Sequence, residues 1–65
     1  MLNVKELKKA MVVNGYDRPR LAEALGMSTR TLATRFKTGD FGASEIQIMI
    51  KILKLKKPMD IFFAD

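Results

Sequence analysis

The sequence predicts an all-α domain of five helices. Five segments place apolar residues three or four positions apart, the spacing that gathers them on one face of a helix. Residues that cap a helix (Asn, Asp, Ser) or open its first turn (Pro) stand at the starts of these segments. The chain contains no internal repeat and no low-complexity linker, so we expect a single domain over residues 1–65.

The composition excludes several classes of protein. A chain of 65 residues buries only ~60% of its unfolded surface and is expected to be marginally stable alone. It has no cysteine and no histidine, which excludes disulfides and thiolate or imidazole zinc sites, and we expect no cofactor or metal. No apolar run approaches the ~20 residues of a membrane span and no signal-peptide core is present, so the expected location is the cytoplasm.

The charge balance favours a polyanionic partner. Twelve Lys and Arg stand against seven Asp and Glu, which gives a net charge of +5 and an isoelectric point near 9.9. A lysine-rich surface also keeps a small protein soluble, so charge alone leaves the partner open.

The first helix is expected from Asn3 to about Asn14. Asn3 followed by Glu6 predicts a capping box, in which each side chain bonds the backbone N–H of the other residue. Gly15 follows the expected end of the helix. The core face is expected to hold Val4, Leu7, Ala10 and Met11, and the lysines at 5, 8 and 9 are expected to face solvent.

Residues 17–39 predict two short helices joined by a tight turn. Asp17 and Ser28 are the expected N-caps, and Gly26 supplies the left-handed residue that ends the first of these two helices. The buried residues are expected to be Leu21, Ala22, Leu25, Met27, Leu32 and Phe36. A small residue at 22, glycine at 26 and an apolar residue at 32 form the spacing of a helix-turn-helix. A plain helical hairpin that only packs a core is the alternative.

The last two helices carry more apolar residues than one core needs. Ser44 is the expected N-cap of the fourth, whose core stripe is expected to be Ile46, Met49, Ile50 and Leu53. Ile48 and Ile52 fall on another face, and Phe41 is expected to anchor the preceding loop. The fifth helix runs from Pro58 to about Phe63 and ends in three consecutive bulky residues. We therefore predict a homodimer or partner contact, with two of the three residues folding back on the core as the alternative. The candidate contact residues are Ile52, Leu55, Phe62 and Phe63.

The second helix of the motif is expected to enter the major groove of DNA. The candidate base contacts are Thr29, Arg30, Ala33 and Thr34. The candidate phosphate contacts are Arg18, Arg20, Ser28, Arg35, Lys37, Thr38, Gly39 and Ser44. Arg35 has an alternative as the ion-pair partner of Glu23 or Glu45. A second basic cluster, the lysines at 51, 54, 56 and 57, is expected to be a solvated face or a distal phosphate contact.

The chain resembles the small phage Cro and repressor family of helix-turn-helix regulators. Phe36-Lys37-Thr38-Gly39 repeats the family's ending of the recognition helix, and the resemblance covers most of the chain. It implies a compact five-helix lambda-repressor-like domain that binds a double-stranded DNA operator as a homodimer and regulates transcription, as a repressor. The chain departs from the family at Arg18, where a glutamine often braces the recognition helix.

Two other interpretations stay open at this point. The scaffold can serve as a protein-interaction module, for example a modulator of a repressor or an antitoxin. The chain can also be one domain of a longer repressor. An enzyme is not expected, because the carboxylates are scattered and no glycine-rich phosphate loop is present.

Overall fold

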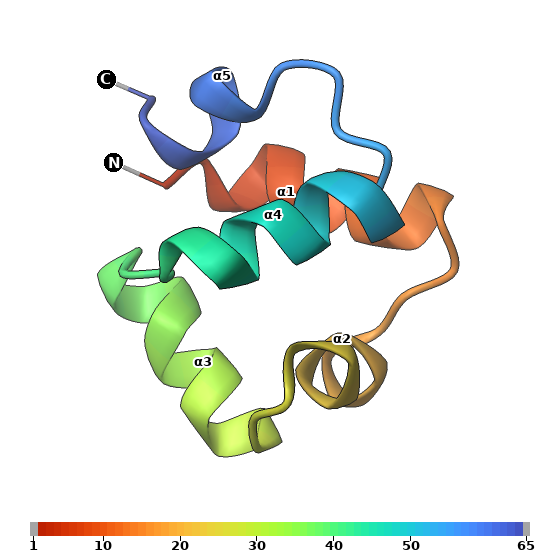
Figure 1. The fold of residues 1–65 in the computed structure, drawn as a ribbon, viewed down its shortest axis with the longest axis vertical. Helices are drawn as coiled ribbons and strands as arrows, with labels where there is room; N and C mark the ends of the chain where they lie inside the picture. Colours follow the sequence, from red (N-terminus) through yellow and green to blue (C-terminus); the bar gives the residue numbers. More distant parts are fainter. Residues whose placement is uncertain (1, 65) are drawn as a thin grey trace.

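The computed structural model describes residues 2–64, which fold as five α-helices without a strand (Figure 1). The helices are α1 (Val4–Val13), α2 (Arg18–Leu25), α3 (Thr29–Thr38), α4 (Ala43–Ile52) and α5 (Pro58–Phe62). In Figure 1, α4 crosses the middle of the molecule, with α1 and α5 above it and the α2–α3 pair below. The all-α prediction is confirmed. No helix in the described range is long and apolar enough to cross a membrane.

The two helices of the predicted motif begin as expected. The Asp17 carboxylate accepts the backbone N–H of Arg20 at 2.9 Å, which satisfies an amide that has no partner inside α2. The Ser28 hydroxyl accepts the backbone N–H of Thr31 at 3.1 Å and does the same for α3. Gly26 ends α2 with φ of 72° and ψ of 30°, the left-handed conformation.

The capping box predicted for α1 is only half formed. The Asn3 side chain accepts the backbone N–H of Glu6 at 3.2 Å, as expected. The backbone N–H of Asn3 donates to the carbonyl of Ile61 at 2.6 Å, so it is not the partner of the Glu6 side chain. A tertiary contact with α5 has replaced the local one.

The cap predicted for α4 is wrong. Gly42 is the N-cap, and Ser44 is an exposed residue of the first turn. The Glu45 side chain accepts the backbone N–H of Gly42 at 2.9 Å, so a residue of the first helical turn supplies the hydrogen-bond partner of the N-cap amide. The N-cap of α4 therefore lies two residues before the predicted one, and no serine hydroxyl caps the helix.

The core is a single cluster to which every helix contributes. It contains Leu2, Leu7, Met11, Leu21, Ala22, Leu25, Leu32, Phe36, Met49, Leu53, Ile61 and Phe62. Phe41 packs edge-on against Phe36 and Phe62, with ring centroids 6.0 and 6.1 Å away, so it anchors the α3–α4 loop. Ile61 and Phe62 fold back on this core while Phe63 is 61% exposed, which was the alternative to a wholly exposed cluster.

Candidate nucleic-acid interface

The turn between α2 and α3 fixes how the two helices cross. The Met27 amide donates to the Ala22 carbonyl at 3.0 Å across the left-handed Gly26, so the chain reverses within a few residues. Ala22 is 2% exposed, as expected for a small side chain at a close helix crossing. The geometry therefore matches the packing positions that the spacing of the motif predicts.

Helix α3 has one buried face and one solvent face. Leu32 and Phe36 are buried, one turn apart. The exposed residues of the helix are Thr29, Arg30, Thr31, Ala33, Thr34, Lys37 and Thr38. All four residues predicted to contact bases are in this set, and α3 contains no acidic residue. The exposed surface of α3 is thus positively charged and rich in short hydroxyl side chains.

Two hydroxyls of this region have partners within the chain. The Ser28 hydroxyl donates to the Thr31 hydroxyl at 2.9 Å, so its proton is not free for the phosphate contact predicted from the sequence. The Thr34 hydroxyl donates to the carbonyl of Arg30 at 3.2 Å, one turn back along the helix. Its methyl group and its lone pairs remain available on the exposed face.

The two arginines at the start of α2 rest on aromatic rings. The Arg18 guanidinium lies 5.4 Å from the centroid of Phe36, so a cation–π contact joins α2 to α3. Arg20 lies 5.3 Å from the centroid of Tyr16 and donates to the carbonyl of Gly15 at 3.3 Å. Both residues are exposed. Arg18 therefore braces α3 against α2 through its contact with Phe36.

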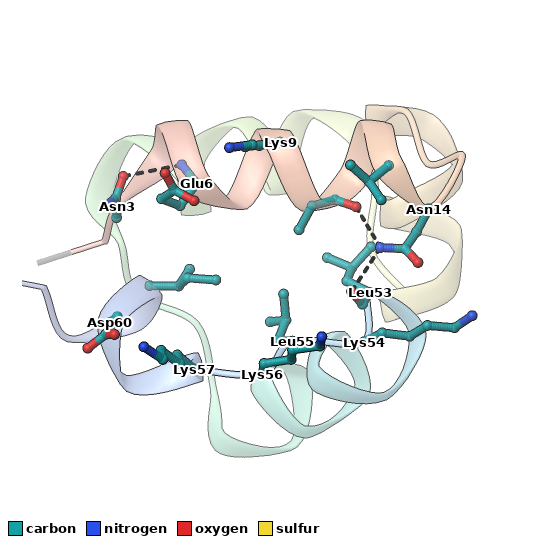
Figure 2. Close-up of a pocket in the computed structure, with 13 residues that line it drawn as sticks. Asn3, Glu6, Lys9, Asn14, Leu53, Lys54, Leu55, Lys56, Lys57 and Asp60 are labelled. Carbon is teal, nitrogen blue, oxygen red and sulfur yellow. Dashed lines mark hydrogen bonds between the residues drawn. The ribbon is translucent and has the colours of Figure 1, made fainter.

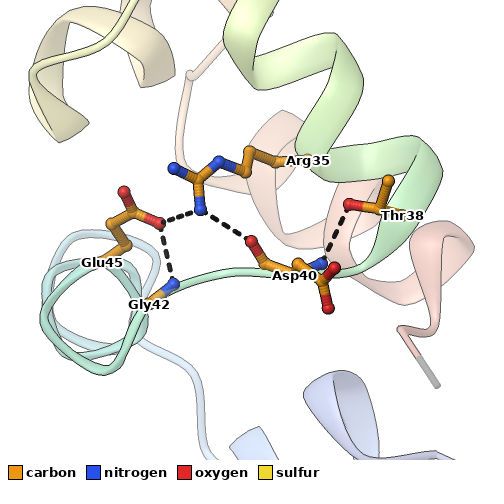
Figure 3. A network of polar contacts seen from close by, with 5 residues as sticks. All are labelled: Arg35, Thr38, Asp40, Gly42 and Glu45. Atoms are coloured by element: carbon orange, nitrogen blue, oxygen red, sulfur yellow. Dashed lines mark hydrogen bonds and ion pairs between the residues drawn. The ribbon is translucent and has the colours of Figure 1, made fainter.

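Arg35 belongs to the junction between α3 and α4 (Figure 3). Its Nη1 donates to the carbonyl of Asp40 at 2.7 Å and lies 3.3 Å from Glu45 Oε1. Glu45 Oε1 also accepts the N–H of Gly42, and the amide of Asp40 donates to the Thr38 hydroxyl at 3.2 Å. Of the two sequence-based interpretations of Arg35, the structure shows the pair with Glu45, and Nη1 is not free for a phosphate.

The other predicted phosphate contacts differ in availability. Lys37 and Ser44 are exposed. The N–H of Gly39 donates to the carbonyl of Arg35 at 2.7 Å and is not free for a phosphate. A Cβ at Gly39 would lie 3.3 Å from Leu2 Cβ, and its φ of 77° is left-handed, so this glycine serves packing and chain direction.

The predicted dimer contacts do not form one surface. Phe62 is 5% exposed and belongs to the core, and Ile52 and Leu55 are half-buried against it. Of the four predicted residues only Phe63 is exposed, at 61%, and the neighbouring Met59, which the sequence did not single out, is 65% exposed. Val12 and Val13 were also missed, at 77% and 76% exposed, although both lie off the stripe formed by Leu7 and Met11. Their positions outside the helical spacing of the core residues would have identified both valines as exposed.

Comparison with known protein families, with curated proteins and with solved structures found no match to this chain. In residues 2–64, acidic side chains do not gather in groups of three or more that could hold a metal ion.

Proposed function

We propose that this chain binds double-stranded DNA in a sequence-specific way, with α3 as the recognition helix of a lambda-repressor-like helix-turn-helix. The observation that carries the proposal is the exposed, acid-free face of α3. Thr29, Arg30, Ala33 and Thr34 lie on it, on a helix that Gly26 sets tightly across α2. The biological role is that of a small Cro-like transcriptional repressor.

The dimensions and chemistry of α3 suit the major groove. The groove is ~12 Å wide and admits one helix, and the 10 residues of α3 span about 15 Å. Arg30 is long enough to donate to O6 and N7 of a guanine in bidentate fashion. Ala33 is small enough to let the helix approach closely, and the Thr34 methyl can pack on the methyl of a thymine.

Phosphate contacts would come from two exposed cations near α3 that form no ion pair in the described part of the chain. Arg18 lies beside Phe36 at the α2–α3 crossing, and Lys37 is exposed near the C-terminal end of α3. Such contacts fix the position of the helix in the groove and make affinity depend on salt, whereas base contacts select the sequence.

Two copies acting together would raise the affinity of so small an interface. Met59 in α5 and Phe63 at its C-terminal end are exposed apolar side chains, and neither belongs to α3. We propose that they form the contact between two copies on DNA. The protein would then select two half-sites, about 10 base pairs apart, arranged as a palindrome.

Enrichment of sites from a randomised duplex pool at moderate salt tests the proposal. A palindrome with two half-sites supports a dimeric repressor, and a single half-site supports DNA recognition without the dimer. Recovery of no sequence, with only salt-sensitive background binding, contradicts the proposal. That outcome would favour the alternative, a protein-interaction module that uses exposed residues such as Phe63.

A further inference from the structure

A groove with an apolar floor lies between α1, the segment that follows α4, and α5 (Figure 2). Its volume is about 650 Å³, and none of its lining residues belongs to α2 or α3. The apolar lining consists of Ala10, Val13, Leu53, Leu55 and Ile61. In Figure 1 the three elements occupy the upper part of the molecule, whereas α3 lies in the lower part. The groove is thus separate from the proposed DNA surface.

Hydrogen bonds tie both ends of α1 to the opposite wall of the groove. At one end the Asn14 side-chain amide donates to the carbonyls of Ala10 and Leu53, each at 2.8 Å. At the other end the backbone N–H of Asn3 donates to the carbonyl of Ile61 at 2.6 Å. Figure 2 shows the two asparagines at opposite ends of the groove. The groove is therefore formed before any ligand arrives, which reduces the entropy lost on binding.

The rim of the groove is positively charged. Its charged lining residues are Lys9, Lys54, Lys56 and Lys57 against Glu6 and Asp60. Within residues 2–64 the single ion pair is that of Arg35 and Glu45, so these lysines are not neutralised by pairing in the described part of the chain. A ligand that fits must be apolar on the side facing the floor and acidic along its edges.

We propose that this groove binds an acidic amphipathic helix of a partner protein. A second copy of this chain carries a net charge of +5 and would oppose the lysine rim. An added β-strand is also disfavoured, because residues 2–64 contain no strand whose edge could pair with it. The longest Cα extent of the molecule is 27 Å, so a bound helix of more than about 18 residues would project beyond the protein.

The proposal goes beyond DNA binding and does not depend on it. Since α2 and α3 do not line the groove, the partner helix and DNA can be held at the same time. The acidic partner would then be brought to the DNA site by the bound protein.

The experiment is a selection of displayed peptides on the immobilised full chain. One library contains 18-residue helical peptides with Leu and Phe on one face and Asp and Glu elsewhere. The matched library replaces every Asp and Glu by Lys. We expect enrichment from the acidic library alone, and selected peptides should shift the NMR amide signals of the groove residues and not those of α3.

Adjacent valines provide a matched pair of variants. Val13 lines the groove and Val12 does not, yet they are 76% and 77% exposed, so Asp at either position has the same effect on charge and a similar effect on folding. Val13→Asp should weaken binding of the selected acidic peptide about tenfold or more, and Val12→Asp less than about twofold. Likewise, K56E/K57E should abolish binding, whereas K5E/K8E, outside the groove, should retain most of it.

Three results would overturn the proposal. The first is no enrichment from the acidic library, and the second is peptide binding that Val13→Asp does not weaken. The third is a dimer of the peptide-free protein in sedimentation that Val13→Asp dissociates, which would make a second copy the occupant. DNA affinity is measured on the same variants and should be equal for Val12→Asp and Val13→Asp, so failure of this proposal is distinguishable from failure of DNA binding.

Discussion

At the scale of single residues, Arg30 is the side chain on which sequence recognition is expected to depend. It is exposed on α3, and its guanidinium makes no hydrogen bond or ion pair within the described chain. Arg30→Ala should weaken binding to the selected DNA site by about 1–3 kcal/mol and relax the base preference at one position. Lys8→Ala, an equal loss of charge on α1, is the control and should have little effect. Equal losses for the two variants in a gel-shift titration would contradict base recognition by Arg30.

Arg35 and Lys37 lie two residues apart on α3 and should behave in opposite ways. Arg35 joins Asp40 and Glu45, so Arg35→Ala should lower the free energy of unfolding by about 1 kcal/mol, measured by urea denaturation. Lys37 is exposed, so Lys37→Ala should leave stability unchanged and reduce the salt dependence of DNA binding by about one phosphate contact. Identical effects of the two substitutions on the salt dependence would refute this division of roles.

The sequence predicted local contacts at the residue scale better than tertiary ones. Asp17 and Ser28 cap their helices as expected, because a cap depends on residues two or three positions away. The amide of Asn3 could not be assigned correctly, since its partner is Ile61 at the other end of the chain. Arg35 was left between two partners for the same reason: only the folded loop brings Glu45 within reach.

At the scale of the helices, α2 and α4 end in the same way but with different residues. Each ends in a left-handed residue followed by an amide that bonds back across the turn, Met27 to Ala22 in α2 and Leu55 to Ile50 in α4. The left-handed residue is Gly26 in α2, but it is Lys54 in α4, with φ of 52°. A side chain with a Cβ is strained in this conformation.

A side chain added at Gly26 and one removed at Lys54 should therefore change the free energy of unfolding in opposite directions. Gly26→Ala should lower the free energy of unfolding by about 1 kcal/mol, and Lys54→Gly should raise it by a smaller amount. No atom outside the turn lies within 4 Å of a Cβ at Gly26, so backbone strain alone is responsible. Urea denaturation of both variants measures the effect, and a more stable Gly26→Ala variant would contradict it.

Helix length decided which elements could be predicted in detail. In α1, α3 and α4, each ten residues long, every buried residue belongs to the predicted set, although Val4, Ala10, Ile46 and Ile50 of that set are only half-buried. Helix α5 has five residues, fewer than two turns, so periodicity could not show which of its consecutive apolar residues are buried. Phe62 packs against Phe41 in the folded chain and is buried.

At the scale of the whole molecule, the structure presents three surfaces, of which the groove and the pair Met59 and Phe63 both involve α5. The exposed face of α3 is basic and hydroxyl-rich, the groove beside α1 has an apolar floor and a lysine rim, and Met59 and Phe63 are exposed at the C-terminal helix. The net charge of +5 was visible in the sequence. The basic cluster at Lys54, Lys56 and Lys57 was also visible, but its place on the rim of a groove was not, because the groove is formed by segments far apart along the chain.

The position of Met59 and Phe63 outside α2 and α3 leads to a prediction about cooperativity on DNA. If Met59 and Phe63 join two copies, Phe63→Asp should abolish cooperative binding to a palindrome and leave affinity for a single half-site almost unchanged. Val12→Asp introduces the same charge at a residue of similar exposure on α1 and serves as the control. Binding is titrated on DNA with one half-site and on DNA with two. Phe63 is proposed to contact only the second copy, so its substitution should affect only the titration on two half-sites. Retained cooperativity in Phe63→Asp would show that the copies meet elsewhere, and a loss of half-site affinity would mean that the C-terminal helix supports α3 directly.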